Sequence, residues 1–257
     1  QSVTVHYDVA ATAPGGGNPT GSVTVSDGTQ SCTATVAAGQ CTIAFTSAGA
    51  RSMTASYAGS SDYTSSTSTT EAHAVDKADT TTTITSDNPD PSVSGQTVTV
   101  QYDVGATAPG AGTPTGSVTV SDGTQSCTAT VAAGQCTIAF TSPGARSLTA
   151  TYAGDSDFNG STSAAEAHSV DKVGTTTSIT SDSPDPSVTG QSVTVDFTVA
   201  SLGGGTPTGT VTVGDGTQSC SASVATGHCT IAFTSTGAKS LTASYAGDSD
   251  FKASDSS

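Results

Sequence analysis

At 257 residues the chain is long enough for one large domain or two to three small ones, and its Thr-, Ser-, Gly-, Val- and Ala-rich composition, with 11% charged residues, indicates an all-β protein. Six Lys and Arg against 21 Asp and Glu leave a formal net charge of -15, which argues against nucleic acid and anionic lipid surfaces as partners. The sequence contains no apolar run of about 18 residues that would span a membrane and no secretory leader, so any export signal or anchor is expected outside it.

The sequence contains three copies of one repeat. The segment Cys32–Cys41 returns unchanged as Cys127–Cys136 and with substitutions as Cys220–Cys229. The third copy lies slightly closer to the second than the second does to the first, because the Gly-rich segment Ala106–Thr113 is shortened there to Ala200–Thr206. A length change confined to such a segment predicts a surface loop.

Seven strands are predicted in the complete middle repeat. Strict alternation over residues 97–104 places Val98, Val100, Tyr102 and Val104 on one buried face, with polar residues on the other. Turn signals such as Asp122-Gly123 separate the strands. The expected strands cover residues 80–86, 97–104, 116–120, 127–131, 136–140, 145–152 and 165–170. Seven strands in about 100 residues predict an immunoglobulin-like β-sandwich.

The domain boundaries follow from the repeat: residues 1–77, 78–172 and 173–257. The first repeat begins at the second strand and the third stops before the seventh, so we expect repeat 1 to lack its first strand and repeat 3 its last. Open edges of this kind are avoided in natural proteins. We therefore interpret the chain as a window from a longer repeat array; the alternatives are a shortened protein and a fibre in which another segment supplies the strands.

These residues resemble the bacterial Ig-like domains, of the group 3 type, that occur in tandem in large surface proteins. The resemblance covers all three repeats and rests on Thr80–Ile84, Pro89–Gln96, Pro114–Val118 and Tyr152–Phe158, the last of which recurs as Tyr57–Tyr63 and Tyr245–Phe251. It implies a tandem β-sandwich fold and a role as a spacer module, or sometimes in adhesion. The cysteine pairs depart from what we expect of the family.

Six cysteines form three pairs of identical spacing on strands that should be neighbours. The expected disulfides are Cys32 with Cys41, Cys127 with Cys136 and Cys220 with Cys229, which indicates an oxidising compartment. The alternatives are paired free thiols and a metal site, for which only the third repeat offers an adjacent histidine, His228.

Aspartates gather at the expected ends of the repeats, where oxygen ligands from neighbouring loops can hold Ca2+ at a domain junction. No recognised calcium-loop spacing is present, so solvated turn carboxylates are the alternative. The candidates are Asp87, Asp90, Asp155, Asp157 and Asp171. No other cofactor is expected.

No catalytic constellation is predicted. His73 and His168 recur, but His6 and His228 do not, and no histidine joins a Ser and an Asp in a repeated pattern. We therefore expect no enzyme. Tyr57, Tyr152 and Tyr245 are expected in the core rather than as ligand platforms.

The surface offers two further alternatives. Thr80–Thr83 can line a flat ice-binding or O-glycosylated face, and Asn159 begins an N-glycosylation pattern. Chains can also associate laterally into fibres along their Thr-rich faces.

The expected function is structural. Linkers as short as Val170–Thr175 restrict rotation, so the repeats are expected to form a semi-rigid rod, joined to further repeats of the same longer chain, in an extracellular or cell-surface stalk or filament. The alternative is a set of adhesin modules that hold a host or neighbouring-cell ligand on loops such as Ala106–Thr113.

Overall fold

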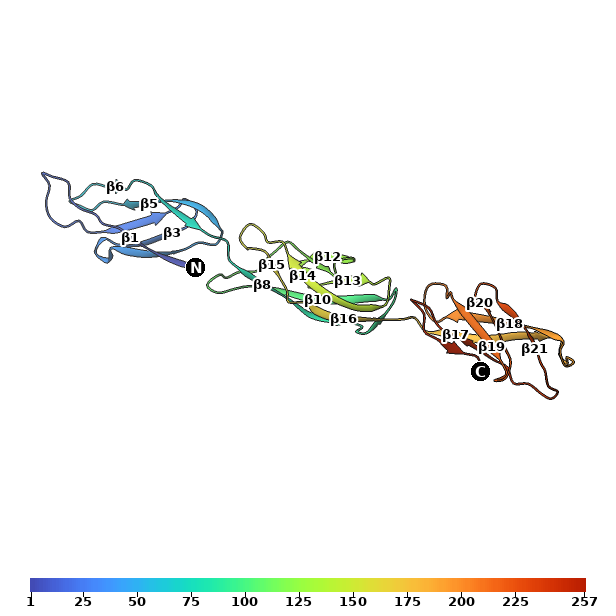
Figure 1. The fold of residues 1–257 in the computed structure, drawn as a ribbon. Helices are drawn as coiled ribbons and strands as arrows, with labels where there is room; N and C mark the ends of the chain where they lie inside the picture. Colours follow the sequence, from blue (N-terminus) through green and yellow to red (C-terminus); the bar gives the residue numbers. More distant parts are fainter.

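The computed structural model describes all 257 residues, and Figure 1 shows three β-sandwiches placed end to end in a row. Strands and two short 3-10 helices make up all the regular structure. The first sandwich contains β1 (Ser2–His6), β2 (Ser22–Ser26), β3 (Ser31–Thr35), η1 (Val36–Ala38), β4 (Gln40–Ala44), β5 (Gly49–Tyr57), β6 (Ser66–Thr67) and β7 (Glu71–Val75).

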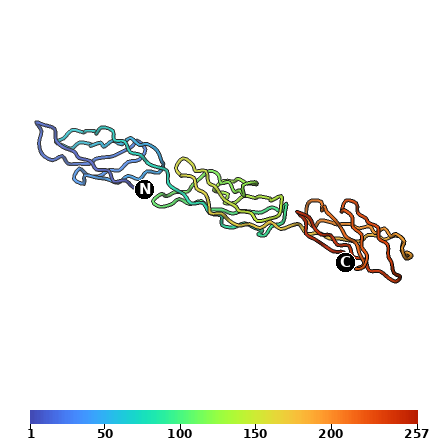
Figure 2. Tube along the Cα trace, in the orientation of Figure 1, coloured from blue at the N-terminus to red at the C-terminus, as the bar shows by residue number.

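The second sandwich contains β8 (Thr80–Asn88), β9 (Ser92–Val93), β10 (Thr97–Ala106), β11 (Ser117–Ser121), β12 (Ser126–Thr130), η2 (Val131–Ala133), β13 (Gln135–Ala139), β14 (Gly144–Tyr152), β15 (Ser161–Thr162) and β16 (Glu166–Asp171). The third contains β17 (Thr175–Ser183), β18 (Ser192–Ser201), β19 (Thr210–Gly214), β20 (Ser219–Ser223), β21 (His228–Ala232), β22 (Thr242–Tyr245) and β23 (Ser254–Asp255). The Cα trace in Figure 2 passes from one sandwich to the next through a single short segment at each junction.

Two sheets enclose the core of the second sandwich. One has the order β13-β10-β8, and the other has the order β12-β11-β14-β16-β9, with β15 pairing to β14. Neighbouring strands are antiparallel except β16 and β9, which are parallel. A core of 14 buried residues lies between the sheets. This is the tandem immunoglobulin-like architecture predicted from the alternation of apolar residues.

The side chains of β10 follow the predicted alternation. Val98 and Val100 are fully buried, and Tyr102 and Val104 are 4% and 6% exposed. The register between β10 and β8 shifts between Gln101 and Tyr102, so that Thr85 of β8 has no ladder partner. The Tyr102 N–H donates to the Gly134 carbonyl on the β13 side of β10, as the Tyr7 N–H does to Gly39 in the first sandwich. The three equivalent tyrosines expected in the core, Tyr57, Tyr152 and Tyr245, are also buried.

Each observed strand differs from its predicted range by one or two residues at one end or both. Val131 was expected on the strand with Cys127, but it begins η2, which Thr130 caps by accepting a hydrogen bond from the Ala133 N–H and which Gly134 ends at φ 64°. β8 continues to Asn88, beyond its predicted end. The two-residue strands β9 and β15 carry too short a pattern to be recognised in the sequence.

The first and third sandwiches repeat this plan with fewer strands. The first pairs β1 with β4 and orders its other sheet β3-β2-β5-β6, with β7 on β5; it has no counterpart of β8. The third has sheets β17-β18-β21 and β20-β19-β22-β23 and no counterpart of β16. Their cores hold 5 and 12 clustered buried residues, against 14 in the second, so the second sandwich has the most complete core.

No helix of the chain has the length and apolar character needed to cross a bilayer.

Candidate functional site

Each sandwich is closed along one side by a disulfide. In the second, Cys127 of β12 and Cys136 of β13 lie on edge strands of opposite sheets, with their Cα atoms 5.9 Å apart. The bonds join the same partners that the spacing predicts, at Cys32–Cys41, Cys127–Cys136 and Cys220–Cys229. No cysteine is left free, so the free-thiol and metal alternatives are wrong for these residues.

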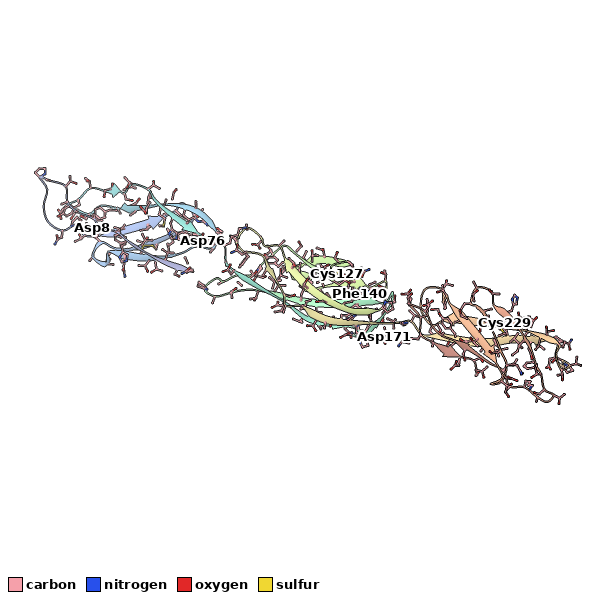
Figure 3. The ribbon with its side chains drawn as sticks, viewed as in Figure 1. Asp8, Asp76, Cys127, Phe140, Asp171 and Cys229 are labelled. Carbon is pink, nitrogen blue, oxygen red and sulfur yellow. A yellow bond between two sulfur atoms is a disulfide. The ribbon has the colours of Figure 1, made fainter.

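The linker between the second and third sandwiches docks onto the third. Figure 3 places Asp171 where one sandwich gives way to the next. Val173 is only 4% exposed; its N–H donates to the Asp250 carbonyl at 2.9 Å, and its own carbonyl accepts from the Lys252 N–H at 2.8 Å. The Lys252 ammonium lies 3.2 Å from the Asp171 carboxylate, across the junction. The linker therefore adds a short parallel bridge to the next sandwich instead of spanning solvent.

The first junction uses the same arrangement with Ala78, whose N–H donates to the Asp157 carbonyl and whose carbonyl accepts from the Asn159 N–H. It adds a direct bond between sandwiches, because the Ala48 N–H donates to Asp157 Oδ1 at 2.7 Å. Pro143 stands at the position of Ala48 in the second sandwich and has no N–H to donate. The first junction is thus closed by a hydrogen bond, and the second by an ion pair.

The loop between β10 and β11 packs against the linker that precedes the second sandwich, and the loop between β18 and β19 packs against the linker that precedes the third. A Cβ at Gly110 would lie 2.5 Å from the Cβ of Ala78, and a Cβ at Gly203 would lie 3.0 Å from Val173. A side chain at residue 110 would therefore force the linker to shift, and one at residue 203 would require the Val173 side chain to move slightly. These loops lie in the segments that would bind a ligand if the repeats were adhesin modules. Part of each loop faces the junction.

The calcium candidates are divided between the two ends of the second sandwich. Asp155 and Asp157 lie at the junction with the first sandwich, whereas Asp87 and Asp90 lie beside β16 and Asp171 ends it. Asp155 is fully engaged: Oδ1 accepts from two backbone N–H groups, and Oδ2 from the N–H and hydroxyl of Thr115.

These bonds govern the charge state of Asp155. Burial by itself raises the pKa of this carboxyl, but the hydrogen bonds from the Thr115 hydroxyl and three backbone N–H groups outweigh burial and hold the pKa well below its usual range. Asp248 repeats the arrangement in the third sandwich. Such carboxylates already have their donors within the fold, which favours a turn-forming role.

A second set of aspartates closes the hairpin turns that precede the first cysteine of each pair. Asp27 Oδ1 accepts from the Thr29 N–H and hydroxyl and from the Gln30 N–H, while Oδ2 lies 3.7 Å from the Arg51 guanidinium. The Gln30 bond is the largest cause that lowers the Asp27 pKa from 3.8 to about 2. Asp122 and Asp215 make the same bonds.

Acid is therefore expected to destabilise the sandwiches over the pH range in which these aspartates become protonated. Because the folded-state pKa of Asp27 is lowered, its contribution to stability is fully present above pH 4 and is lost as the pH falls toward about 2. Urea unfolding midpoints measured between pH 5 and pH 2.5 should decline over this range. Asp27→Asn should flatten the decline for the first sandwich alone; an unchanged profile in that variant would contradict the assignment.

A column of packed cationic and aromatic side chains stands at one side of the second sandwich. The Arg146 guanidinium lies 5.7 Å from the centre of the Phe140 ring, and the imidazole of His168 lies 5.0 Å from the same ring. Arg146 also approaches Asp122 at 3.6 Å. Arg51, Phe45 and His73 repeat the column in the first sandwich.

His168 also joins a serine to an aspartate, a contact that the sequence patterns did not predict. Its Nε2 lies 2.8 Å from Ser92 Oγ and its Nδ1 lies 2.7 Å from Asp87 Oδ2, the order of contacts found in a catalytic triad. Ser92 and His168 are only 1% and 3% exposed, so a substrate cannot reach the hydroxyl. The available signals were the recurrence of His73 and His168 and the return of Asp87 and Ser92 as Asp182 and Ser187.

Asp90 Oδ1 lies 3.4 Å from His168 Nδ1, so Asp87, Asp90 and His168 together place three ligand atoms that can hold a metal ion within 4.8 Å of one another. A hydrogen bond already joins His168 Nδ1 to Asp87 Oδ2, and Asp90 Oδ1 accepts from the Ser169 N–H. Asp171 belongs to a different contact, the ion pair with Lys252.

The structure gives hydrogen-bond partners to residues at both predicted surface sites, Thr80–Thr83 and Asn159. Thr82 is 4% exposed and its hydroxyl contacts Ser161 Oγ at 2.7 Å, so alternate residues of Thr80–Thr83 face β15 and not solvent. The Asn159 side chain is exposed and donates to Asp79 Oδ1 at 2.9 Å.

Comparisons with known proteins place the repeats in a family. The sequence model of the bacterial Ig-like domain (group 3) matches residues 1–76, 84–171 and 179–257. A crystal structure described as a tetra-tandem repeat in the extending region of a large adhesion protein is similar over 93% of this chain, at 16% identity and a TM-score of 0.45. The chain covers 66% of that structure's length. No curated protein matches the chain.

Proposed function

Because the chain belongs to the bacterial Ig-like domain (group 3) family, we propose that it is a disulfide-clamped, semi-rigid spacer segment of a long extracellular stalk or filament. Its domains span residues 1–77, 78–172 and 173–257. The observation that carries the proposal is the docking of each linker onto the sandwich that follows it, through Ala78 and Val173. A spacer needs this feature because free linkers would let the array collapse.

The length and packing of the linkers support limited rotation. Only Lys172–Gly174 separate β16 from β17. The middle residue, Val173, is buried, and both its N–H and its carbonyl are hydrogen-bonded to the third sandwich. The loops that contain Gly110 and Gly203 pack against the same linkers. Loops used in this way support a spacer role over ligand binding, since a ligand would have to compete with the junction for part of their surface.

The chemistry of the chain supports an extracellular setting and no enzymatic role. Three disulfides persist only where the surroundings are oxidising. The Ser92 hydroxyl is buried and already paired with His168, so it stabilises the fold rather than attacking a substrate.

Replacing Val173 by serine is expected to loosen the second junction. Loss of the buried apolar side chain costs about 2 kcal/mol, which raises the undocked fraction by roughly 30-fold. Small-angle X-ray scattering should then show a shorter and broader distribution of intramolecular distances. Val188→Ser is the matched control, because Val188 is 72% exposed and lies between β17 and β18, outside the linker. Identical scattering from both variants would show that linker docking does not stiffen the array.

Electron microscopy of material from the native source tests the spacer role itself. Long fibres or stalks with an axial repeat of one domain are expected. Saturable binding of the chain on a glycan array would instead favour the adhesin alternative.

A further inference from the structure

Two carboxylates and an imidazole converge beside β16 in the second sandwich. Asp87 Oδ2 lies 2.7 Å from His168 Nδ1, Asp90 Oδ1 lies 3.4 Å from the same nitrogen, and all three atoms lie within 4.8 Å of one another. Asp87 belongs to β8, Asp90 to the turn between β8 and β9, and His168 to β16. No other group of three histidine, cysteine or acidic residues in the chain brings its ligand atoms this close together.

The carboxylate of Asp87 lacks the donors that other partly buried aspartates have. Asp155 accepts four hydrogen bonds from the fold, whereas Asp87, with a side chain only 8% exposed, has one donor at most, the His168 imidazole. Neither Asp87 nor Asp90 forms an ion pair with a lysine or an arginine. A carboxylate removed from water without such partners is costly. The two facing carboxylates therefore leave negative charge that a divalent cation offsets.

The far side of the imidazole is arranged for metal binding at Nδ1. Ser92 Oγ lies 2.8 Å from Nε2, and the imidazole itself is fully buried. When Nε2 carries the ring proton and donates it to this hydroxyl, the lone pair of Nδ1 points at the two carboxylates. The contact with the Phe140 ring, at 5.0 Å, packs against the imidazole as well. A hydrogen bond to the nitrogen that does not bind the ion is what orients metal-binding histidines in general.

The spacing of the three atoms suits zinc better than calcium. Zn2+ takes nitrogen and carboxylate ligands at about 2.0 to 2.2 Å, which sets neighbouring ligand atoms of a tetrahedral site about 3.4 Å apart. The separation of Asp90 from His168 already has this value, and that of Asp87 from His168 needs to open by about 0.7 Å when the ion takes the place of the hydrogen bond. Calcium takes at least about six oxygen ligands, so the imidazole nitrogen disfavours it.

Asp90 holds its carboxylate in place and opens the group to solvent. Its side chain is 37% exposed, so an ion can enter from this side and keep water as a further ligand. Asp90 Oδ1 accepts from the Ser169 N–H of β16 at 2.9 Å, and an oxygen with two lone pairs can keep this bond while it binds an ion. Pro89 and Pro91 restrict the backbone on either side. Only the small movement of Asp87 is left to complete the site.

We propose that Asp87, Asp90 and His168 bind one divalent transition-metal ion of the zinc class, with water as the remaining ligand. The ion joins β8, the strand by which the chain enters the second sandwich, to β16, the strand by which it leaves. The disulfide closes the edge between β12 and β13, and the ion adds a reversible clamp between two other strands. The site goes beyond the spacer role, which does not require it.

Calorimetric titration of Zn2+ into the whole chain, first freed of metal with a chelator, tests the proposal. Saturable binding of one ion per chain is expected, with half-saturation at roughly 10 µM or below. The NMR signals of the His168 imidazole should shift, and hydrogen exchange of β8 and β16 should slow. Ca2+ at about 1 mM should not displace the zinc, because it has little affinity for a nitrogen ligand.

Matched variants separate this site from the many surface carboxylates. Asp90→Asn can keep the hydrogen bond from Ser169 but loses the charge, so Zn2+ should bind at least roughly tenfold more weakly, a loss typical even of an outer hydrogen-bond partner. Asp103→Asn removes the same charge from an exposed position of β10 and should leave the affinity unchanged. Absence of saturation at about 1 mM Zn2+, or equal affinity in the two variants, would overturn the inference. So would displacement by Ca2+, or zinc binding that leaves the His168 signals unmoved.

Discussion

Replacing His168 by alanine is expected to lower the free energy of unfolding of the second sandwich by about 3 to 4 kcal/mol. The imidazole is fully buried and connects three elements: β16, which carries it, β9 through Ser92, and β8 through Asp87. Alanine leaves the 8% exposed Asp87 carboxylate and the buried Ser92 hydroxyl without this partner and removes the ring contact with Phe140. A buried polar group without a partner costs more than the bond it made.

His73→Ala in the first sandwich is the matched control for this prediction. His73 makes the same ring contact, with Phe45 at 5.2 Å, but lacks the counterparts of Asp87 and Ser92. Its replacement is expected to cost only about 1 kcal/mol, the value of an aromatic contact. Hydrogen exchange of the whole chain, resolved by peptide mass spectrometry, measures each sandwich separately. Equal losses in the two variants would show that the serine and aspartate bonds contribute nothing.

Removing one disulfide is expected to have the second large effect. Replacing Cys127 and Cys136 together by alanine should lower the stability of the second sandwich by about 2 to 3 kcal/mol, because the short closed loop no longer restricts the unfolded chain. For a domain of this size the unfolding temperature falls by roughly 10 to 20 °C. The bond also ties edge strands of opposite sheets, so the edge between β12 and β13 should open first.

Calorimetry of this double variant provides its own control. The Cys32–Cys41 and Cys220–Cys229 bonds remain, so only one of the unfolding transitions should move. Addition of a reducing agent should then lower the remaining transitions toward the same range. A double variant that unfolds at the unchanged temperature would mean that the clamp contributes little to stability.

The fold was largely predictable because its signals are local. Alternation in residues 97–104 identified the buried face of β10, and the copied Cys-to-Cys segment identified both the repeat and the disulfide partners, which lie only nine residues apart. Val131 was predicted on a strand because the alternation of apolar residues continues into it. In the structure it begins a 3-10 helix, which Thr130 caps and Gly134 ends. The strand β9 was missed because two residues show no period.

The sequence by itself determined the number of repeats, the β-sandwich class and the cysteine pairing, since each depends on residues that are neighbours along the chain or copies of one another. Only the tertiary structure decided how the linkers dock, how the two junctions differ, and that Ser92, His168 and Asp87 meet. His168 is 76 residues from Ser92 and 81 from Asp87, and Val173 bonds to residues nearly a whole repeat away. Contacts of such separation depend on how the strands fold back on one another, which no local pattern in the chain records.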